Sequence, residues 1–430
     1  MTEWEDTLRF EMDNQSLVYR PGEFVSGTAI LRLTEPCTAR VVTIKLRGFA
    51  KTRWEYRRSS RRHDHTSYSH TDRYGGDIDI ARQEVVVWSD QQSEKIPAGM
   101  HQFKFQFQLP PSCLPSFEGE YGQVRYRLHA EVDRPWRFDH DCHLTFTVTT
   151  PCDLNLYPEL KEPAFHIVCE KTGLPLFRRG DVGVEVYMPK KGFVPGETIP
   201  VRITIKNESS KDMEKVTLTL REYADYAGYY GADNQFPVNA LFSAAATGDS
   251  LKEQRRNVAS VDFKLNMAAH AEGSFDFGLQ IPPVVASFQC ALIRVYYMLR
   301  IEVETSATFN STVKLKMPVV IGTLPFRENF PLPAVNTAGY PNHVIPNPQP
   351  TQQPGFVRDA PEFAPQPTTA PTAPPMEYSG PSAPGVDAPP SYAESVFGAT
   401  APEGDEKPFA PRFPFYPSLS DDSLKVPPKE

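Results

Sequence analysis

The sequence has no long apolar segment. No run approaches the 18 or more apolar residues that a bilayer-spanning helix needs. The N-terminus, MTEWEDTLRFEMD, is acidic and lacks the apolar centre of a secretory signal. We therefore expect neither a membrane-spanning nor a secreted protein.

Closely spaced cysteines are also missing. The six cysteines are scattered, none forms a C-x-x-C pair, and no close group of Cys and His has zinc spacing. The expectation is a set of reduced, mostly buried thiols, with no metal site and no cofactor. The six are Cys37, Cys113, Cys142, Cys152, Cys169 and Cys290.

A basic global field and catalytic motifs are absent as well. The net charge is −8, so the composition does not favour a nucleic-acid partner. No G-x-S-x-G, P-loop or H-E-x-x-H motif occurs. We predict that the protein is not an enzyme, and the weakest alternative is an enzyme or redox-regulated binder that acts through a thiol.

The first 324 residues have strand patterns, and no stretch keeps a 3.6-residue apolar period over four turns. Their spacing, with turn residues between them, predicts all-β sandwiches of immunoglobulin-like type. The predicted strands are Thr28–Leu33, Val41–Leu46, Glu84–Trp88, Phe103–Leu109, Val124–Val132, His143–Thr149, Ile199–Ile205, Val216–Leu220, Ser260–Leu265, Phe275–Ile281, Val295–Val303 and Thr312–Ile321.

Five segments of the first half recur in the same order in the second half, at offsets between 171 and 174 residues. Together they indicate a duplicated domain. The pairs are Tyr19–Glu23 with Phe193–Glu197, Val42–Arg47 with Val216–Arg221, Phe107–Pro111 with Leu279–Pro283, Ser116-Phe117 with Ser287-Phe288, and Val124–Val132 with Val295–Val303.

The repeated segments have physical interpretations. Pro-Gly-Glu between two strands predicts a turn, because proline fixes φ and glycine takes the left-handed conformation. A Pro-Pro pair ends a strand, because proline has no N–H to donate. An alternating Val-x-Tyr-x-Leu strand buries one face.

The last 106 residues differ from the rest. They hold 25 of the 43 prolines and a net charge of −6 out of −8. This composition predicts a disordered tail. We therefore divide the chain into a first β domain at 1–152, a second at 153–322 and a disordered proline-rich tail at 323–430.

Three short motifs lie within 22 residues of this tail. Two have the form P-[ST]-A-P and one has the form P-P-x-Y. Proline-dense peptides already populate polyproline II, so they lose little backbone entropy when they dock in an aromatic groove. The motif residues are Pro371, Thr372, Ala373 and Pro374; Pro381, Ser382, Ala383 and Pro384; and Pro389, Pro390, Ser391 and Tyr392.

The order of the repeated features resembles the arrestin fold, with two β-sandwich domains in tandem. The segment GFVPGETIPVRITIKNESS at Gly192–Ser210 is typical of that fold, and LRGFAKTRWEY at Leu46–Tyr56 is similar to its first domain. With a P-P-x-Y motif in the tail, the chain resembles the α-arrestins, or arrestin-domain-containing proteins.

This resemblance implies a trafficking adaptor in the cytoplasm, at the cytosolic face of the plasma membrane and endosomes, with receptors or transporters as cargo. Pro389, Pro390 and Tyr392 would bind WW domains of HECT-type ubiquitin ligases. The P-[ST]-A-P motifs would bind the ubiquitin-E2-variant domain of ESCRT-I, leading to ubiquitination, endocytosis, sorting or vesicle budding. The alternative keeps the fold but makes the chain a structural trafficking subunit, similar to the arrestin-fold retromer component, with a passive tail.

One departure concerns the number of P-P-x-Y motifs. Many animal α-arrestins have two, whereas here Pro374–Tyr378, PPMEY, has one residue too many before the tyrosine. The sequence therefore predicts one intact WW ligand beside two ESCRT-I ligands.

Residues 52–73 form an arginine-rich segment with two interpretations. It is either a basic loop that contacts anionic lipid headgroups or phosphorylated cargo, or a solvated hairpin loop. The arginines assigned to such a contact are Arg53, Arg57, Arg58, Arg61 and Arg62. Likewise Ser418–Ser423, SLSDDS, is either a site for an acid-directed kinase or an acidic solvated terminus.

Overall fold

The computed structural model describes most of the first 327 residues and a few short parts of the tail. The described residues are 7–61, 67–89, 95–135, 140–171, 180–231, 235–236, 241, 248–306, 312–327, 393–394, 409–416 and 419.

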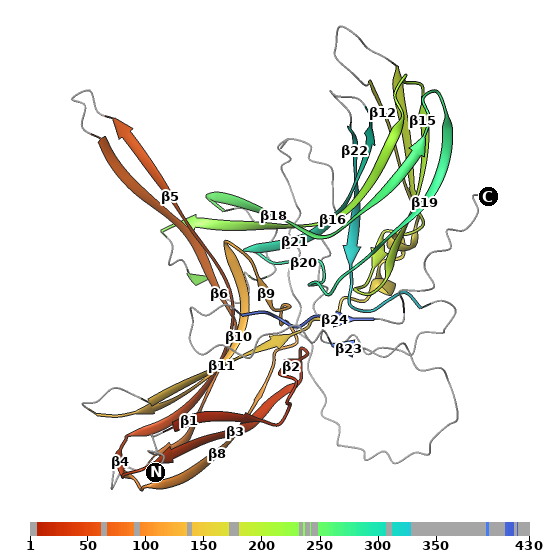
Figure 1. Cartoon of the computed structure of the whole chain (residues 1–430). Coiled ribbons are helices and arrows are strands. Elements are labelled where there is room, and N and C mark those ends of the chain that lie inside the picture. The colour runs from red at the N-terminus through yellow and green to blue at the C-terminus, as the bar shows by residue number, and fades with distance from the viewer. Residues whose placement is uncertain are drawn as a thin grey trace, which may run out of the picture.

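The first domain is a sandwich of two sheets (Figure 1). One sheet has the order β1 (Thr7–Met12), β3 (Phe24–Leu33), β8 (Gly99–Gln108) and is antiparallel. The other has the order β6 (Ser67–Ser89), β5 (Val41–Arg61), β10 (Gly122–Asp133), β11 (His140–Val148), β2 (Val18–Tyr19).

The second domain repeats this plan. Its four-stranded sheet has the order β12 (Ala164–Lys171), β13 (Asp181–Met188), β15 (Thr198–Asn207), β19 (Glu272–Gln280). The facing strands are β14 (Gly192–Phe193), β22 (Thr312–Ile321), β21 (Ile293–Thr305), β16 (Met213–Tyr230) and, paired to β16, β18 (Ser250–Met267).

Short elements complete the described fold. They are β4 (Cys37–Thr38), β7 (Lys95–Ile96), β9 (Phe117–Glu118), the 3-10 helices η1 (Leu154–Leu156) and η2 (Pro158–Lys161), β17 (Gln235–Phe236), β20 (Phe288–Gln289), β23 (Ala393–Glu394) and β24 (Pro414–Phe415). Neither helix of the described residues is long and apolar enough to cross a membrane.

The predicted all-β tandem sandwich is confirmed, but β5, β6, β16 and β18 extend well beyond the predicted strands, and β1, β12 and β13 were not predicted. The segment from residue 52 to 73, predicted as a loop, belongs largely to β5 and β6, which pair from Val41↔Ser89 to Arg61↔Ser67. Figure 1 shows these two strands as a long arm that extends away from the sandwich. The prediction gave weight to the dense arginines and missed the alternation of Thr52, Trp54 and Tyr56 with charged residues; Trp54 is buried in the structure.

Both Pro-Gly-Glu segments form the predicted turns. Gly22 has φ +84° and Gly196 has φ +102°, the region that glycine adopts without strain. In each turn the glutamate carboxylate accepts a hydrogen bond from the backbone N–H three residues earlier, 2.8 Å in the first copy and 3.0 Å in the second. The two copies therefore share the turn and its side-chain cap.

The equivalent strands β10 and β21 bury the same positions of each copy. Tyr126 and Tyr297 are fully buried, and each hydroxyl donates to a backbone carbonyl, Leu114 O at 2.8 Å and Val285 O at 2.7 Å. Because an unpaired buried hydroxyl is unfavourable, this bond fixes the tyrosine in the core of each sandwich.

Candidate interaction site at the interdomain junction

The two domains join through main-chain pairing. β16 of the second domain pairs with β6 of the first at Tyr229↔Gly75 and Tyr230↔Tyr74. Beside this ladder the buried Thr52 hydroxyl donates to Ala227 O at 2.7 Å. The strands β6 and β16 extend beyond their own sandwiches, and main-chain hydrogen bonds between them hold the two domains together at this junction.

Aromatic side chains fill the space next to this framework. The Tyr226 ring of β16 lies 5.8 Å from the Tyr121 ring in an edge-to-face arrangement, and the Phe117 ring lies 5.7 Å from the Phe288 ring. A Cβ at Gly119 would overlap the Tyr226 hydroxyl, so glycine is needed there for the close approach. Burial raises the pKa of Tyr226, and the hydroxyl remains protonated at physiological pH.

A buried carboxylate lies behind this aromatic cluster. Glu222 Oε2 is 3.0 Å from the Tyr297 hydroxyl and 3.0 Å from Arg256 Nη2. Glu222 is buried while Arg256 is half-exposed. The arginine therefore connects the core of the second domain to the surface of the junction, where it lines a pocket together with Phe117 and Glu118 of the first domain.

Part of the tail occupies this junction. Residues 409–416 contact both domains, and their β24 lies between the two sandwiches in Figure 1. Phe409 and Phe413 line the same pocket as Arg256. Phe409 and Tyr416 are buried, with 8% and 3% of their surface exposed. Burial of large aromatic side chains is the main stabilising term of such a contact.

Hydrogen bonds fix the register of this segment on both domains. Arg412 Nη1 donates to Ser16 O of the first domain at 2.7 Å, and its backbone N donates to Thr147 Oγ1 at 3.2 Å. On the second domain the Tyr416 hydroxyl donates to Thr323 O at 2.7 Å. We call residues 409–416 the docked segment; it links the two domains in addition to the β6–β16 ladder.

The sequence analysis assigned no role to the docked segment. Its signal is aromatic density, because PFAPRFPFYP at residues 408–417 holds four aromatic side chains, whereas the motif-bearing residues 371–392 hold two. Disordered segments are poor in aromatic residues. This local difference in composition predicts a part of the tail that packs on a folded surface.

The predicted peptide motifs lie outside the described residues, so their contacts stay predictions. Two residues that directly follow Tyr392 are described: Ala393 and Glu394 form β23, which pairs with β24 of the docked segment. The chain leaves the second domain at Arg327, whose backbone N donates to Asn155 Oδ1 at 2.9 Å. The polypeptide that carries the motifs therefore starts and ends at the junction.

The predicted basic contact is only partly described. Arg53 and Arg57 lie on β5 with exposed side chains; Arg58 and Arg61 belong to the same strand, with side chains outside the described set, and Arg62 is outside it altogether. Acidic partners accompany the arm, since Arg73 Nε is 2.9 Å from Glu55 Oε1. The described part of the arm is thus mixed in charge.

Thiol chemistry finds no support in the buried cysteines. Burial raises the pKa of Cys113 and Cys152 to about 12 and that of Cys290 to about 11. These thiols remain protonated at neutral pH, and the thiolate is the nucleophilic form. Cys169 is exposed, on β12.

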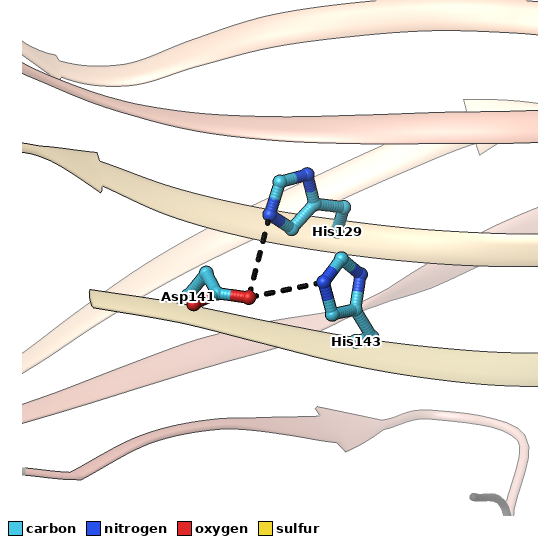
Figure 2. Close-up of side chains that lie close together, drawn as sticks. All are labelled: His129, Asp141 and His143. Atoms are coloured by element: carbon cyan, nitrogen blue, oxygen red, sulfur yellow. Dashed lines mark ion pairs between the residues drawn. The ribbon is translucent and has the colours of Figure 1, made fainter. Parts of the chain in front are cut away.

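Three side chains that can ligate a metal lie together on the first domain, away from the docked segment: His129, Asp141 and His143 (Figure 2). Their ligand atoms all lie within 4.8 Å of one another. The expectation of no metal site used spacing along the chain, and these residues come from two strands. Desolvation, followed by the neighbouring His143, lowers the pKa of His129.

Comparisons with known proteins agree with this architecture. Residues 8–155 match the family "Arrestin (or S-antigen), N-terminal domain", and residues 178–326 match "Arrestin (or S-antigen), C-terminal domain". "Arrestin domain-containing protein 17" of Caenorhabditis elegans is 29% identical over 330 residues, which cover 74% of this chain and 71% of that protein.

Two mammalian relatives have a similar relation to the chain. "Arrestin domain-containing protein 1" of Mus musculus is 26% identical over 353 residues, covering 81% of this chain and 72% of the relative. The Homo sapiens protein of the same name is 26% identical over 403 residues, covering 93% of this chain and 78% of the relative. Since the two family matches follow one another across the duplicated sandwiches, the chain belongs to the arrestin family.

Proposed function

We propose that this arrestin-family protein is an α-arrestin-type trafficking adaptor. Its two sandwiches would recognise membrane protein cargo, and its tail would recruit a WW-domain HECT ubiquitin ligase and the ubiquitin-E2-variant domain of ESCRT-I. The resulting ubiquitination of cargo or adaptor would direct endocytosis, sorting or vesicle budding. The adaptor would work in the cytoplasm, at the cytosolic face of the plasma membrane and endosomes.

One observation carries the proposal: the motif-bearing polypeptide begins and ends at the interdomain junction. Arg327 and the docked segment are both held by hydrogen bonds there. A tail attached at both ends keeps the P-[ST]-A-P and P-P-x-Y motifs near the cargo-binding sandwiches. Restricting the volume that a ligand explores raises its effective concentration for a partner bound nearby.

The alignment with the human relative supports a role for the tail. It covers 93% of this chain, which is more than the two domains alone contain. A passive tail would leave the sandwiches as the functional part, as in a retromer-like structural subunit. The two functions differ in whether the tail binds partners.

A pulldown with isolated domains tests the proposal. The full chain is incubated with a WW domain of a HECT ligase and, separately, with the ubiquitin-E2-variant domain. We expect Tyr392→Ala to abolish WW binding, because the tyrosine pocket is then empty. Tyr378→Ala in the PPMEY sequence is the matched control and should leave WW binding unchanged.

The ESCRT-I arm uses the two P-[ST]-A-P motifs. Pro374→Ala combined with Pro384→Ala should abolish binding of the ubiquitin-E2-variant domain, and each single change should weaken it because the motifs act together. Pro354→Ala and Pro367→Ala, outside the motifs, are the matched control. Absence of binding by the unaltered chain to both domains would favour the structural subunit with a passive tail.

A further inference from the structure

His129 and His143 lie directly opposite each other on neighbouring antiparallel strands. His129 is on β10 and His143 on β11, in register as cross-strand partners. Their rings stack with centroids 4.1 Å apart and an angle of 16° between the planes. Asp141, two residues before His143, lies on the same face of the sheet because side chains alternate along a strand. Figure 2 shows the three side chains converging on one point.

The distances between the ligand atoms approach those of a metal centre. Asp141 Oδ2 is 3.0 Å from His143 Nε2 and 3.9 Å from His129 Nε2. Ligands at 2.0–2.2 Å from a tetrahedral ion are about 3.3 Å apart. The longer distance therefore has to shorten by about 0.6 Å, and one imidazole has to turn out of the stacked arrangement, because the nitrogen lone pair lies in the ring plane and two nearly parallel rings do not point at one ion. Asp141 is half-exposed and has room to rotate.

The donor set selects the kind of ion. Two imidazole nitrogens and one carboxylate oxygen suit Zn²⁺ and its first-row neighbours, whereas Ca²⁺ and Mg²⁺ prefer oxygen ligands. A neighbouring carboxylate, that of Glu131 opposite Asp141 in the register, is already 2.6 Å from Lys45 Nζ. Three protein ligands leave at least one position of a tetrahedral ion for water.

We propose that His129, Asp141 and His143 bind one divalent transition-metal ion of the zinc type on the outer face of β10 and β11. Such an ion would tie the two strands together where β11 has little support on its other side. Among the described residues β11 pairs with β2 only at Thr147 and Val148. The site would act as a cross-link of the sheet edge.

The second shell sets the expected affinity. His143 Nδ1 is buried and has no hydrogen-bond partner among the described residues. A hydrogen-bond partner at the second ring nitrogen of a metal-ligating histidine usually raises metal affinity by about 10–100-fold. The site should therefore bind more weakly than a structural zinc centre and should release the ion to a chelator.

Zinc binding by the full chain, measured by calorimetry, tests the site. Every chain compared, including the reference called the unaltered chain, carries Cys169→Ser, so that the exposed thiol on β12 does not bind zinc. We expect one Zn²⁺ per chain, and a loss of affinity of at least about tenfold in His129→Ala and in His143→Ala. Asp141→Asn should lower affinity less, since its amide oxygen remains a weak ligand. His166→Ala, an exposed histidine on β12, is the matched control and should change nothing.

A second readout separates binding from folding. Co²⁺ in place of zinc should give the visible absorption of a tetrahedral centre in the unaltered chain, and His129→Gln should lose it while keeping the circular dichroism of the folded protein. Zinc should also raise the melting temperature of the unaltered chain and not that of the double variant. Equal zinc affinity in the unaltered chain and in His129→Ala with His143→Ala would overturn the proposal, as would a failure of the unaltered chain to bind.

Discussion

The two Pro-Gly-Glu turns have nearly the same hydrogen bonds but different surroundings. In the first copy Gly22 N donates to Leu109 O at 3.0 Å, and in the second Gly196 N donates to Ile281 O at 2.9 Å. A Cβ at Gly22 would meet no atom within 4 Å, whereas a Cβ at Gly196 would overlap the backbone of Tyr416. The second turn therefore serves as a docking surface, and the first is open.

The cores of the two copies also differ, at the position opposite the buried tyrosine. Gly48 is the cross-strand partner of Tyr126 in the first domain, and Glu222 is that of Tyr297 in the second. In the first copy the tyrosine ring fills the space that a side chain at Gly48 would need. In the second the space holds a carboxylate, which Arg256 connects to the junction. The two copies share the strand pairing, and the second copy has polar contacts that face the docked segment.

Exchanging the core residues should give the largest effect. Gly48→Glu places a Cβ within 2.5 Å of the Tyr126 ring and buries an unpaired carboxylate. We expect a loss of about 4 kcal/mol in the free energy of unfolding, from overpacking together with the buried charge. Urea denaturation measures it.

The reverse exchange, Glu222→Gly, is the matched comparison for Gly48→Glu. We expect a smaller loss of about 2 kcal/mol, because the Tyr297 hydroxyl keeps Val285 O at 2.7 Å. Equal losses in the two variants would mean that the difference between the cores has no energetic weight.

Alanine in the two turns should separate the open turn from the docked one. Gly22→Ala introduces only the strain of a positive φ, about 1 kcal/mol. Gly196→Ala introduces the same strain and also displaces Tyr416, whose backbone N donates to Pro195 O at 3.0 Å. We expect Gly196→Ala to lower the free energy of unfolding by about 2–3 kcal/mol in total.

Hydrogen exchange of the docked segment reads this difference directly. Amide protection at Tyr416 should fall in Gly196→Ala and stay unchanged in Gly22→Ala. If both variants leave that protection unchanged, the second turn does not support the docked segment.

Asp225 on β16 and Lys51 on β5, which are equivalent positions of the two copies, should differ in how they make the stability depend on pH. Burial raises the pKa of Asp225 from 3.8 to about 6, so the folded chain binds this proton more tightly than the unfolded chain. The resulting stability is fully present below pH 3.8 and is lost as the pH rises through 6. At pH 7 the ionised carboxylate is unfavourable.

The variant Asp225→Asn tests the predicted loss of stability with rising pH. We expect the variant to gain about 1 kcal/mol over the unaltered chain at pH 7 and nothing at pH 4, since the carboxylate is only partly buried. Lys51→Gln, at the equivalent position of the first copy, should show no such pH-dependent difference. A gain for Asp225→Asn that is the same at both pH values would rule out the carboxylate as its cause.

The smallest structural effect is expected on the β5–β6 arm. Arg57→Glu changes an exposed side chain and should alter stability by less than about 0.5 kcal/mol. If the arm contacts the cytosolic membrane face, the variant should bind phosphatidylserine vesicles about thirtyfold more weakly, because it removes one positive charge and adds one negative charge at about 1 kcal/mol per charge near the surface. Lys314→Glu, exposed on β22 of the second domain, is the control. Unchanged vesicle binding by Arg57→Glu would favour a solvated arm.

The duplicated fold was predictable because its signals are local. Val124–Val132 alternates apolar and polar residues, and it falls within β10. The Pro-Gly-Glu turns require glycine at a positive φ, so the motif itself specifies the conformation. By contrast, β5 continues 15 residues beyond the predicted end at Leu46, because it pairs with β6 over a segment whose dense charge obscures the alternation of Thr52, Trp54 and Tyr56.

The candidate sites were less predictable because they depend on register and long-range packing. His129 and His143 are 14 positions apart in the sequence and meet because β10 and β11 pair in one register. Phe409 and Tyr416 lie in a tail whose overall composition predicts disorder; a pocket lined by both domains buries Phe409, and Tyr416 packs with Val194 and Val320 of the second domain. A one-residue shift in strand pairing would move every such side chain to the opposite face.

The sequence by itself determined the all-β class, the duplication and the presence of the peptide motifs, since each rests on residues near one another in the chain. The tertiary structure decided what the two copies do with that plan: which turn is covered, which core holds a carboxylate and which histidines share an aspartate. Those features join residues 14 to nearly 400 positions apart, as in the bond from Arg412 to Ser16. Contacts over such separations depend on the packing of whole domains, which no local pattern contains.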